Sequence, residues 1–483
     1  MKFGTSGLRG LVTDLEGRLS ALYSTAFAHH LIQNGLAKPG DRIFVGEDYR
    51  PSSRGIAATC IGALERSGLR PVSCGALPTP ALAYYAMSKG RASLMITGSH
   101  IPADRNGIKF YRPDGEIDKN DEHSITLLAS ECDATLKDIT PGNAESEAAE
   151  AKLHFSARTS HILPVGALSG LKVGVYQHSS VARDELVETI ASYGAEIISL
   201  GRTDTFIPVD TEAVSSATIA LLKKWTVEHR LDAIVSADGD GDRPLVSDEH
   251  GTPLRGDLLG LMVARLLKPD VIVTPVTSNS GIKQSAGCKV FRTRVGSPFV
   301  IEGMTKAVGA GAQRVLGFEA NGGVLLGSDF RIEDRNLTAL PTRDCFLPIL
   351  AALMLARQES LSLSALVAQF ALPIAAADRL ENFPLEVGTA LMSHLNTSPQ
   401  NLSEWFSQLG PVSEVNAIDG LRIVLADERI IHLRPSGNAP EMRCYVEAKD
   451  QEGAQALLQQ GLSMLRNWAT ESAHYPQINS ETD

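Results

Sequence analysis

Three aspartates, Asp238, Asp240 and Asp242, alternate with glycines in the segment SADGDGDR at residues 236–243. The glycines allow the backbone to curl tightly, so that all three carboxylates can face one point. A hard cation such as Mg²⁺ prefers oxygen ligands at near-octahedral positions, and three carboxylates with one phosphate oxygen would suit it. The spacing therefore predicts a magnesium site.

A calcium loop of the EF-hand type is the closest alternative for this segment. Such a loop also begins with alternate aspartates, and Glu249 falls at its twelfth position. However, Arg243 stands at the sixth position, where the loop needs glycine. The flanking segments LDAIV (231–235) and PLV (244–246) have the composition of strands, whereas an EF-hand needs helices. We therefore favour a catalytic Mg²⁺ site over a calcium site or a solvated acidic loop.

Ser99 is the candidate nucleophile. The segment MITGSHIP (95–102) leaves an apolar strand and enters a loop of glycine and proline, which can present a hydroxyl. An alternative is a hydrolase in which His100 activates Ser99. This alternative is weaker, because triad partners usually lie far apart in sequence and need a third, orienting group. The nearby segment NGIKF (106–110) adds Lys109, whose charge could stabilise a phosphoryl group in transfer.

A second group of polar residues lies near the carboxyl end, in RPSGNAPEMR at 434–443. Arginine forks bind two phosphate oxygens at once, while a hydroxyl and exposed backbone N–H groups bind the others. The segment therefore predicts a phosphate-binding loop, although a surface turn with solvated arginines has the same composition. Its candidate residues are Arg434, Ser436, Gly437, Asn438 and Arg443.

Two further glycine-containing segments could contact a substrate. In GFEANGG (317–323), Glu319 and Asn321 are suited to hydrogen-bond two neighbouring sugar hydroxyls, although an ordinary loop fits these residues equally well. In GTSGLRG (4–10), Thr5, Ser6 and Arg9 could surround an anion, or the segment could be a flexible leader.

Charge and hydropathy exclude several classes of protein. The net charge is −11, which argues against nucleic acid as a partner. The apolar run at 345–356 contains Pro348 and is well short of the roughly 20 residues that a bilayer needs, so we expect a buried core helix and no membrane association. The amino terminus has no apolar stretch of the secretory kind, and the cysteines lie far apart. We expect a cytoplasmic protein with reduced, structural cysteines.

The elements that position these residues follow a βα pattern. β-branched runs at 42–46, 171–175 and 271–274 are each followed by a turn and a stretch of helical spacing, which predicts parallel sheets in three successive α/β units. Residues 138–157 are rich in Ala and Glu and could form an exposed connecting helix. Alternating runs at 421–425 and 430–433 predict antiparallel strands.

The expected domains are therefore three α/β domains at 1–150, 151–255 and 256–372, a smaller α+β domain at 373–470, and a disordered tail at 471–483. The length of 483 residues suits this number of domains, each of roughly 100 to 150 residues.

Taken in order, GTSGLRG, TGSH, DGDGDR, GFEANGG and RPSGNAP resemble the α-D-phosphohexomutase superfamily, which includes phosphomannomutases and phosphoglucomutases. The resemblance covers nearly the whole chain. It implies an α/β fold of four domains around a central cleft, in which three α/β domains with mixed sheets precede a smaller α+β C-terminal domain.

The resemblance also implies a role for each candidate residue. Ser99 would be the phosphoserine, and its phosphate would bind one Mg²⁺ together with Asp238, Asp240 and Asp242. His100 and Lys109 would assist proton and charge movement, and Arg9 would lie near the reacting phosphate. The residues expected to bind substrate are Thr5, Ser6, Arg243, Arg294, Glu319, Asn321 and the phosphate-binding loop residues Arg434, Ser436, Gly437, Asn438 and Arg443.

The activity implied first is the reversible interconversion of mannose 6-phosphate and mannose 1-phosphate, with hexose 1,6-bisphosphate as intermediate and activator. Phosphoglucomutase activity, alone or in addition, is the main alternative; a phosphoglucosamine mutase or a non-catalytic sugar-phosphate binding protein is less favoured. Ile101, Asn438 and Gly323 depart from the usual family motifs, which affects the expected sugar more than the chemistry. We expect small hexose phosphates as partners, without nucleic acid or membrane, and a monomer or homodimer.

Overall fold

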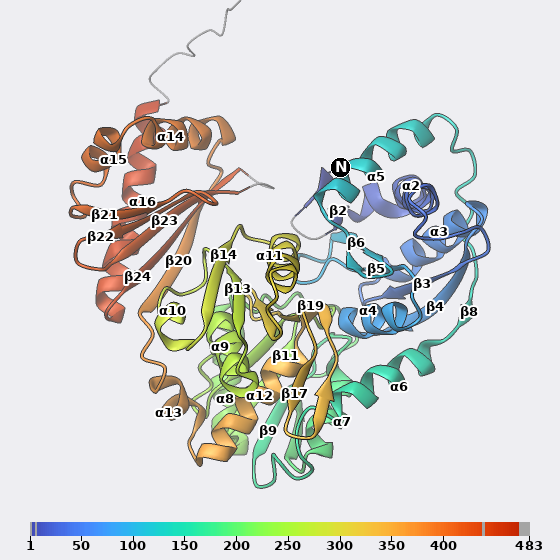
Figure 1. Cartoon of the computed structure of the whole chain (residues 1–483), viewed down its shortest axis with the longest axis horizontal. Coiled ribbons are helices and arrows are strands. Elements are labelled where there is room, and N and C mark those ends of the chain that lie inside the picture. The colour runs from blue at the N-terminus through green and yellow to red at the C-terminus, as the bar shows by residue number, and fades with distance from the viewer. Residues whose placement is uncertain (1, 5–6, 437–439, 473–483) are drawn as a thin grey trace, which may run out of the picture. The chain divides into compact units, whose positions relative to one another are not determined.

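The computed structural model describes residues 2–4, 7–436 and 440–472 of the chain (Figure 1). These residues form two compact units, which are described separately here. Unit 1 contains residues up to 274 together with 286–291 and 296–370, and unit 2 contains 275–285, 292–295 and the residues from 371 on.

The first sheet of unit 1 has the strand order β1-β2-β6-β5-β3-β4-β8, with β7 paired to β6 (Figure 1). β3 is parallel to β4 and β5, whereas β6 is antiparallel to β5 and β2. The strands are β1 (Lys2–Phe3), β2 (Leu8–Leu11), β3 (Arg42–Glu47), β4 (Arg70–Ala76), β5 (Ser93–Ile96), β6 (Arg105–Arg112), β7 (Gly115–Glu116) and β8 (Glu145–Ser146).

Both faces of this sheet are covered, which explains why residues 43–46 of β3 and all four residues of β5 are buried. Side chains alternate between the faces of a strand. Ile43 and Val45 join the core beneath α2, α3 and α5, while Phe44 packs against Tyr85 of α4. α5 begins at a capping box in which Asp118 and Asp121 each accept a backbone N–H. The helices are α1 (Val12–Asp14), the π-helical turn Leu15–Leu19, α2 (Ser20–Gln33), α3 (Ser53–Arg66), α4 (Thr79–Ser88), α5 (Lys119–Asp133) and α6 (Ala148–Thr159).

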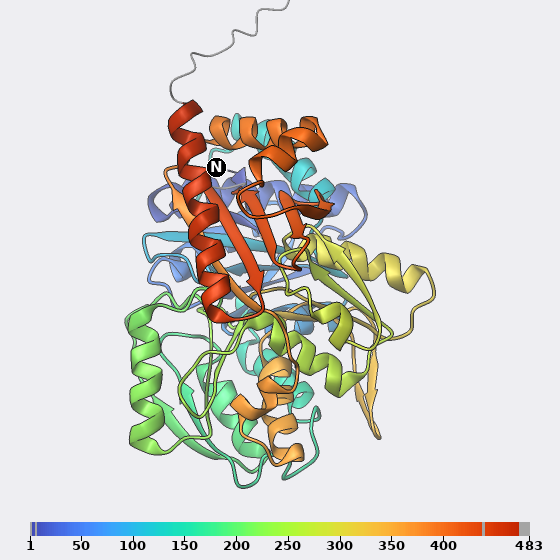
Figure 2. The same cartoon turned by 90° about the vertical axis from the view of Figure 1, so that its left-hand side faces the viewer.

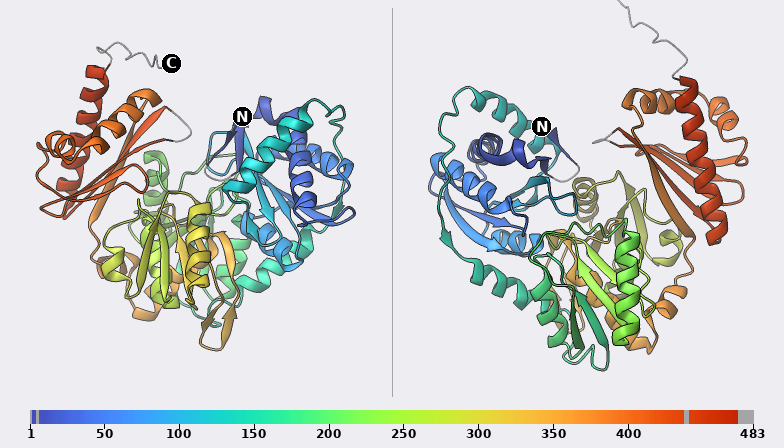
Figure 3. Two further views of the ribbon diagram at one scale, coloured as in Figure 1. Left: turned by 45° about the horizontal axis from the view of Figure 1, so that its top comes forward. Right: turned by 180° about the vertical axis from the view of Figure 1, so that it is seen from behind.

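The second sheet has the order β10-β9-β11-β12, and Figure 3 shows α8 beside its strands. β9 is parallel to β10 and β11, and β12 returns antiparallel to β11. The elements are β9 (Lys172–Tyr176), α7 (Arg183–Ser192), β10 (Glu196–Leu200), α8 (Ser216–His229), β11 (Ala233–Ala237) and β12 (Pro244–Ser247).

The third sheet has the order β14-β13-β15-β16-β19, and β17 and β18 form a separate antiparallel ribbon. The strands are β13 (Val271–Pro275), β14 (Lys289–Thr293), β15 (Val315–Phe318), β16 (Val324–Leu326), β17 (Phe330–Ile332), β18 (Arg335–Leu337) and β19 (Leu340–Asp344). The accompanying helices are α9 (Gly256–Leu267), α11 (Ser297–Gly309), α12 (Phe346–Glu359) and α13 (Leu363–Ala368).

One strand arrangement occurs in all three sheets. The orders β4-β3-β5-β6, β10-β9-β11-β12 and β14-β13-β15-β16 are equivalent. In each, the third strand is parallel to the second and is followed along the chain by an antiparallel partner. The structure therefore contains the three α/β units that the spacing of the apolar runs predicted.

Unit 2 is built on an antiparallel sheet with the order β20-β24-β23-β22-β21. The long helix α16 packs along the sheet (Figure 2), and Leu457, Leu462 and Leu465 contribute to the core that they share. The elements are α10 (Ile282–Ser285), β20 (Ile374–Glu381), α14 (Leu385–Thr397), α15 (Pro399–Trp405), β21 (Val412–Asn416), β22 (Leu421–Leu425), β23 (Ile430–Pro435), β24 (Glu441–Ala448) and α16 (Gln451–Ser472).

The predicted α/β class is confirmed, as are the parallel strands at β3, β9 and β13 and the antiparallel strands β22 and β23. The apolar run that contains Pro348 forms the buried helix α12, with the proline in the first turn, where no intrahelical N–H bond is needed. No helix in the described part of the chain has the length and apolar character that crossing a membrane requires.

The prediction of a connecting helix over 138–157 is wrong in extent and exposure. Helix α6 begins only at Ala148, because Glu145–Ser146 instead extend the first sheet as β8. Phe155 is buried because its ring packs against Phe346, at 5.1 Å between centroids. α16 continues to Ser472, and the rest of the predicted tail lies outside the described residues. The domain boundaries at 150, 255 and 372 stay predictions.

Two buried histidines should make the protein sensitive to mild acid. Burial lowers the pKa of His178 and of His432 to about 4, against about 6.5 in an unfolded chain. As the pH falls below 6.5, the unfolded state therefore gains protons that the folded state does not. The free energy of unfolding therefore has its full value above pH 6.5. It should fall between pH 6.5 and pH 4, by up to about 1.4 kcal/mol per pH unit for each histidine.

Urea unfolding midpoints measured between pH 7 and pH 5 test this expectation. The variant His178→Gln/His432→Gln should show a shallower dependence on pH than the unaltered chain. Equal slopes for the two proteins would contradict it.

Candidate functional site

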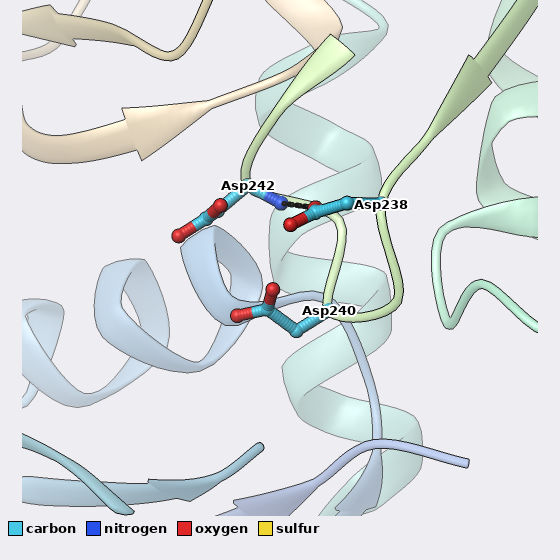
Figure 4. Close-up of side chains that lie close together, drawn as sticks. All are labelled: Asp238, Asp240 and Asp242. Carbon is cyan, nitrogen blue, oxygen red and sulfur yellow. Dashed lines mark hydrogen bonds between the residues drawn. The ribbon is translucent and has the colours of Figure 1, made fainter. Parts of the chain in front are cut away.

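The acidic loop of residues 238–242 follows β11 and leads into β12. Asp238, Asp240 and Asp242 are buried, and one oxygen from each lies within 4.8 Å of the others. Figure 4 shows the three carboxyl groups on the same side of the loop, and its dashed line marks the bond from the Asp242 N–H to Asp238 Oδ1, 3.2 Å long. Gly241 takes a φ of +69°, which allows the tight return. The three carboxylates therefore converge as their spacing predicted, and their role as metal ligands stays a prediction.

Two carboxylate oxygens of this loop accept no hydrogen bond and are therefore suited to bind a cation. Lys109 Nζ donates to Asp240 Oδ2 and to Asp242 Oδ2, each at 2.5 Å. The other oxygens, Asp240 Oδ1 and Asp242 Oδ1, are buried and have no hydrogen-bond partner. A buried carboxylate oxygen without a partner costs free energy, and a hard divalent cation would satisfy it. The loop therefore offers converging oxygen ligands of the kind that a divalent metal ion needs.

Ser99 lies against this loop, in the connection that follows β5. Its side chain is buried, and its Oγ donates to Asp238 Oδ2 at 2.5 Å. His100 Nδ1 lies 3.3 Å from the same Oγ. Ser99 has a φ of +56°, which is unusual for a residue other than glycine. The backbone thus turns the hydroxyl towards the carboxylates.

Arg50 holds the Ser99 loop in this conformation. Its guanidinium donates to the carbonyl oxygens of Ser99, Ile101, Pro102 and Arg105 at 2.5–3.0 Å. The candidate residues chosen from the sequence did not include it. Its only signal there was its position just after an apolar strand, in the segment VGEDYR at 45–50.

Charges around the loop shift the proton affinities of its members. Burial and the neighbours Asp240 and Asp242 raise the pKa of Asp238 to about 8. Burial would raise the pKa of Asp242 as well, but Arg343, Lys109 and Arg243 outweigh it and lower that pKa well below its usual range. For Lys109, burial lowers the pKa, but Asp240 and Asp242 reverse the effect and leave it raised. The ammonium is therefore charged at neutral pH.

Two further basic groups, Arg9 and His100, lie close enough to this cluster to feel its charges. Burial, with the nearby charges of Arg243 and Arg343, lowers the pKa of Arg9 to about 10, so Arg9 is still cationic at neutral pH. Burial and the charges of Arg243 and Arg9 lower the pKa of His100 strongly, so its imidazole is neutral. Excess positive charge beside a buried hydroxyl favours an anion such as a phosphoryl group.

The loop after β15 brings Glu319 and Asn321 to the same cluster through Arg343. Arg343 Nη1 donates to Glu319 Oε2 at 2.9 Å, and its Nε and Nη2 donate to Asp242 Oδ2 at 3.0 and 2.8 Å. Asn321 Nδ2 lies 3.5 Å from Glu319 Oε2. Arg343 was not among the site residues predicted from the sequence. The indication there was a charge in the segment LPTRD (340–344), directly before an apolar helix.

Other candidates belong to unit 2. Arg434 and Arg443 stand directly opposite each other on the antiparallel strands β23 and β24. Like charges in such a pair repel, and a bound anion would relieve the repulsion. Arg434 Nε donates to Asp419 Oδ1 at 2.9 Å, and the Ser436 N–H donates to the Glu441 carbonyl at 2.9 Å.

Arg294 directly follows β14 of the third sheet and groups with unit 2 by its contacts. Its Nε donates to the Ile418 carbonyl at 3.2 Å, and the Val295 N–H donates to Asp419 Oδ2 at 2.8 Å. Asp419 therefore joins the segment after β14 to Arg434. Four candidates lie outside the described residues: Thr5, Ser6, Gly437 and Asn438.

Comparisons with known proteins agree with this arrangement. The chain matches models of the phosphoglucomutase/phosphomannomutase α/β/α domain I over residues 1–134, of domain III over 255–372 and of the C-terminal domain over 399–461. It is 55% identical over 468 residues to a phosphomannomutase of Sinorhizobium fredii, which covers 96% of this chain and 99% of that one. It is 40% identical over 473 residues to a phosphomannomutase of Salmonella muenchen, with 97% and 96% of the two chains covered.

The fold has solved counterparts as well. The crystal structure of a phosphoglucomutase/phosphomannomutase family protein from Burkholderia thailandensis superposes with a TM-score of 0.75 at 20% identity, covering 96% of this chain and 97% of that chain. Fold and sequence together define an isomerase of the hexose-phosphate mutase class. The chain belongs to the phosphoglucomutase/phosphomannomutase family, within the superfamily that its motifs resemble. This family is metal-dependent, in keeping with the acidic loop.

Removing one unpaired carboxylate oxygen should weaken metal binding selectively. Asp240→Asn replaces an anionic ligand with a neutral one. Loss of a residue that only supports a metal ligand typically lowers metal affinity roughly 10–100-fold, and we expect the Mg²⁺ affinity of this variant to fall by more than that. Isothermal titration calorimetry with MgCl₂ measures this directly. The control Asp204→Asn alters a side chain of unit 1 that is 99% exposed and should bind as the unaltered chain does. Equal affinities for both variants would contradict the assignment.

Proposed function

We propose that this protein is a phosphomannomutase that interconverts mannose 6-phosphate and mannose 1-phosphate through a phosphoryl group carried on Ser99. The observation that supports it most is the buried Ser99 hydroxyl, which donates to Asp238 beside two carboxylate oxygens that accept no hydrogen bond. The relative at 55% identity, itself named a phosphomannomutase, supports the choice of sugar.

Ser99 begins the cycle phosphorylated. The bond between Ser99 Oγ and phosphorus breaks as the free hydroxyl of a hexose monophosphate bonds to that phosphorus, which gives a hexose 1,6-bisphosphate. This intermediate turns end for end, and its other phosphate returns to Ser99. The attacking hydroxyl gives up its proton and the departing Ser99 Oγ gains one, and the imidazole of His100, 3.3 Å from Ser99 Oγ, is placed to relay this proton to Oγ. In the second half of the cycle the Ser99 hydroxyl gives the proton up again, and the product hydroxyl receives it.

The charged residues around Ser99 hold and neutralise the phosphoryl group. Asp238, Asp240 and Asp242, with the Ser99 phosphate, would bind Mg²⁺, which supplies positive charge to the transferring oxygens. Lys109 keeps one oxygen of Asp240 and of Asp242 turned away from that position. Arg9 and Arg243 contribute further positive charge. Most of the rate would come from positioning and charge neutralisation.

Substrate recognition is divided between hydroxyls and phosphate. Glu319 and Asn321 would read neighbouring sugar hydroxyls. In the proposal, Arg434, Ser436, Gly437, Asn438 and Arg443 hold the phosphate that is not reacting, Arg294 assists them, and Thr5 and Ser6 contact the substrate near Arg9. Hexose 1,6-bisphosphate would act as the activator that phosphorylates Ser99. Protein assembly as a monomer or homodimer and a cytoplasmic location complete the proposal.

Phosphoglucomutase activity, alone or in addition, is the second candidate. The matching family models describe both activities, and glucose and mannose differ only at C2. Values of kcat/KM for mannose 1-phosphate and glucose 1-phosphate decide between them: the proposal expects the mannose substrate to be preferred, and an equal or higher value for glucose would support the alternative.

Replacing the phosphoryl carrier tests the chemistry. Ser99→Ala should abolish turnover and also the labelling of the protein by hexose 1,6-bisphosphate with radioactive phosphate. The matched control, Ser130→Ala, removes an exposed hydroxyl in α5 and should retain both properties. A Ser99→Ala protein that turns over substrate or accepts label would exclude the mechanism.

The paired arginines of unit 2 give a separate test of phosphate binding. Arg443→Ala removes one of two opposed guanidinium groups. A hydrogen bond to a charged group contributes about 1.5–3 kcal/mol, so KM should rise roughly 10–100-fold while kcat changes less. Steady-state kinetics with mannose 1-phosphate measures the effect. Arg466→Ala, on the exposed side of α16, is the control and should leave KM unchanged. An unaltered KM for Arg443→Ala would remove this residue from the substrate site.

A further inference from the structure

Arg343 is a buried cationic residue that contacts two loops. One is expected to bind the metal ion and the other to bind sugar hydroxyls. The Arg343 side chain is 3% exposed and lies on β19. Two of its nitrogens donate to Asp242 in the acidic loop, and the third donates to Glu319 in the loop that follows β15. Because Asp242 is a candidate metal ligand and Glu319 a candidate reader of sugar hydroxyls, one guanidinium connects the two sites.

Gly323 provides the space through which the Arg343 side chain reaches this position. A Cβ atom added at Gly323 would lie 2.5 Å from Arg343 Cδ, 2.6 Å from its Cγ and 3.0 Å from its Cβ. These atoms form the fixed stem of the side chain, not its mobile end. Gly323 does not have a positive φ, so its backbone conformation is open to other residues. The three atoms nearest to such a Cβ all belong to the arginine stem, which is therefore the first obstacle to a side chain here.

We propose that Arg343 is a positioning residue of the mutase reaction, orienting the metal-binding Asp242 and the sugar-reading Glu319 together, and that Gly323 is the residue which admits it. This inference rests on the proposed function for the two tasks that it connects. Neither Arg343 nor Gly323 belongs to the candidate residues chosen from the sequence.

The hydrogen bonds of Asp242 show how the positioning works. Arg343 and Lys109 together direct four charge-assisted contacts at one side of the acidic cluster, with three of them on Asp242 Oδ2. Asp242 Oδ1 is thereby left without a hydrogen-bond partner and available to a cation. The planar fork of arginine fixes the angle between its donors, which the single ammonium of a lysine cannot do. The bond to Glu319 fixes the second carboxylate relative to the first.

A one-carbon addition tests this arrangement without removing any charge. Gly323→Ala should displace the Arg343 stem and weaken Mg²⁺ binding by roughly tenfold, the lower end of the effect of an outer-shell change. KM for mannose 1-phosphate should rise by a similar factor because Glu319 moves as well. The matched control is Gly309→Ala at the end of α11, where an added Cβ meets no atom within 4 Å. It should leave Mg²⁺ affinity, KM and thermal midpoint unchanged.

A double-mutant cycle separates this effect from a general loss of packing. An Arg343→Ala background removes Cγ and Cδ, the two closest atoms, so adding Gly323→Ala should change Mg²⁺ affinity and KM by less than roughly twofold. Arg343→Lys should restore charge but not the bridge, and should bind Mg²⁺ more weakly than the unaltered chain. If Arg343→Ala does not fold, the comparison of Gly323→Ala with Gly309→Ala decides the matter.

Two results would overturn the inference: a Gly323→Ala protein with unaltered Mg²⁺ affinity and KM, or an equal effect of Gly323→Ala with and without Arg343. Calorimetry with MgCl₂ does not depend on turnover. If the unaltered chain failed to interconvert mannose phosphates, the proposed function would be wrong, while the Mg²⁺ measurements would still report on the link between Arg343 and Asp242.

Discussion

The different surroundings of the two carboxylate oxygens of Asp240 and of Asp242 are the constraint on which the rest of the site depends. Cationic and hydroxyl donors from other elements bind one oxygen of each residue, and the other oxygen accepts no hydrogen bond. Burying such groups in the absence of a cation is costly. The surrounding lysine and arginines lower this cost, and they also supply the positive charge that a phosphoryl group needs.

The repeated strand arrangement explains how residues far apart in sequence reach one site. Ser99, the acidic loop and Glu319 occupy the same place in three different sheets. Each lies in the connection between a parallel strand and its antiparallel partner. These are the connections after β5, β11 and β15. In the proposed function, the same type of connection, used three times, would thus provide the phosphoryl carrier, the metal ligands and the carboxylate that binds sugar hydroxyls.

Much of this could be predicted from the sequence because it is encoded locally. Glycines between Asp238, Asp240 and Asp242 specify a tight loop, and β-branched runs specify strands. The roles of Arg50 and Arg343 could not be predicted in the same way, since their partners lie on other elements and no spacing along the chain reveals them. The assignment of Arg294 to unit 2 also depends on a tertiary contact, through Ile418 and Asp419.

The left-handed backbone of Ser99 has an energetic cost. A residue with a side chain costs about 1–2 kcal/mol in that conformation, and glycine costs almost nothing. Glycine would relieve this cost, but it would also remove the hydroxyl that donates to Asp238. In the proposed function, the chain therefore tolerates an unfavourable backbone conformation at the position whose hydroxyl carries the phosphoryl group.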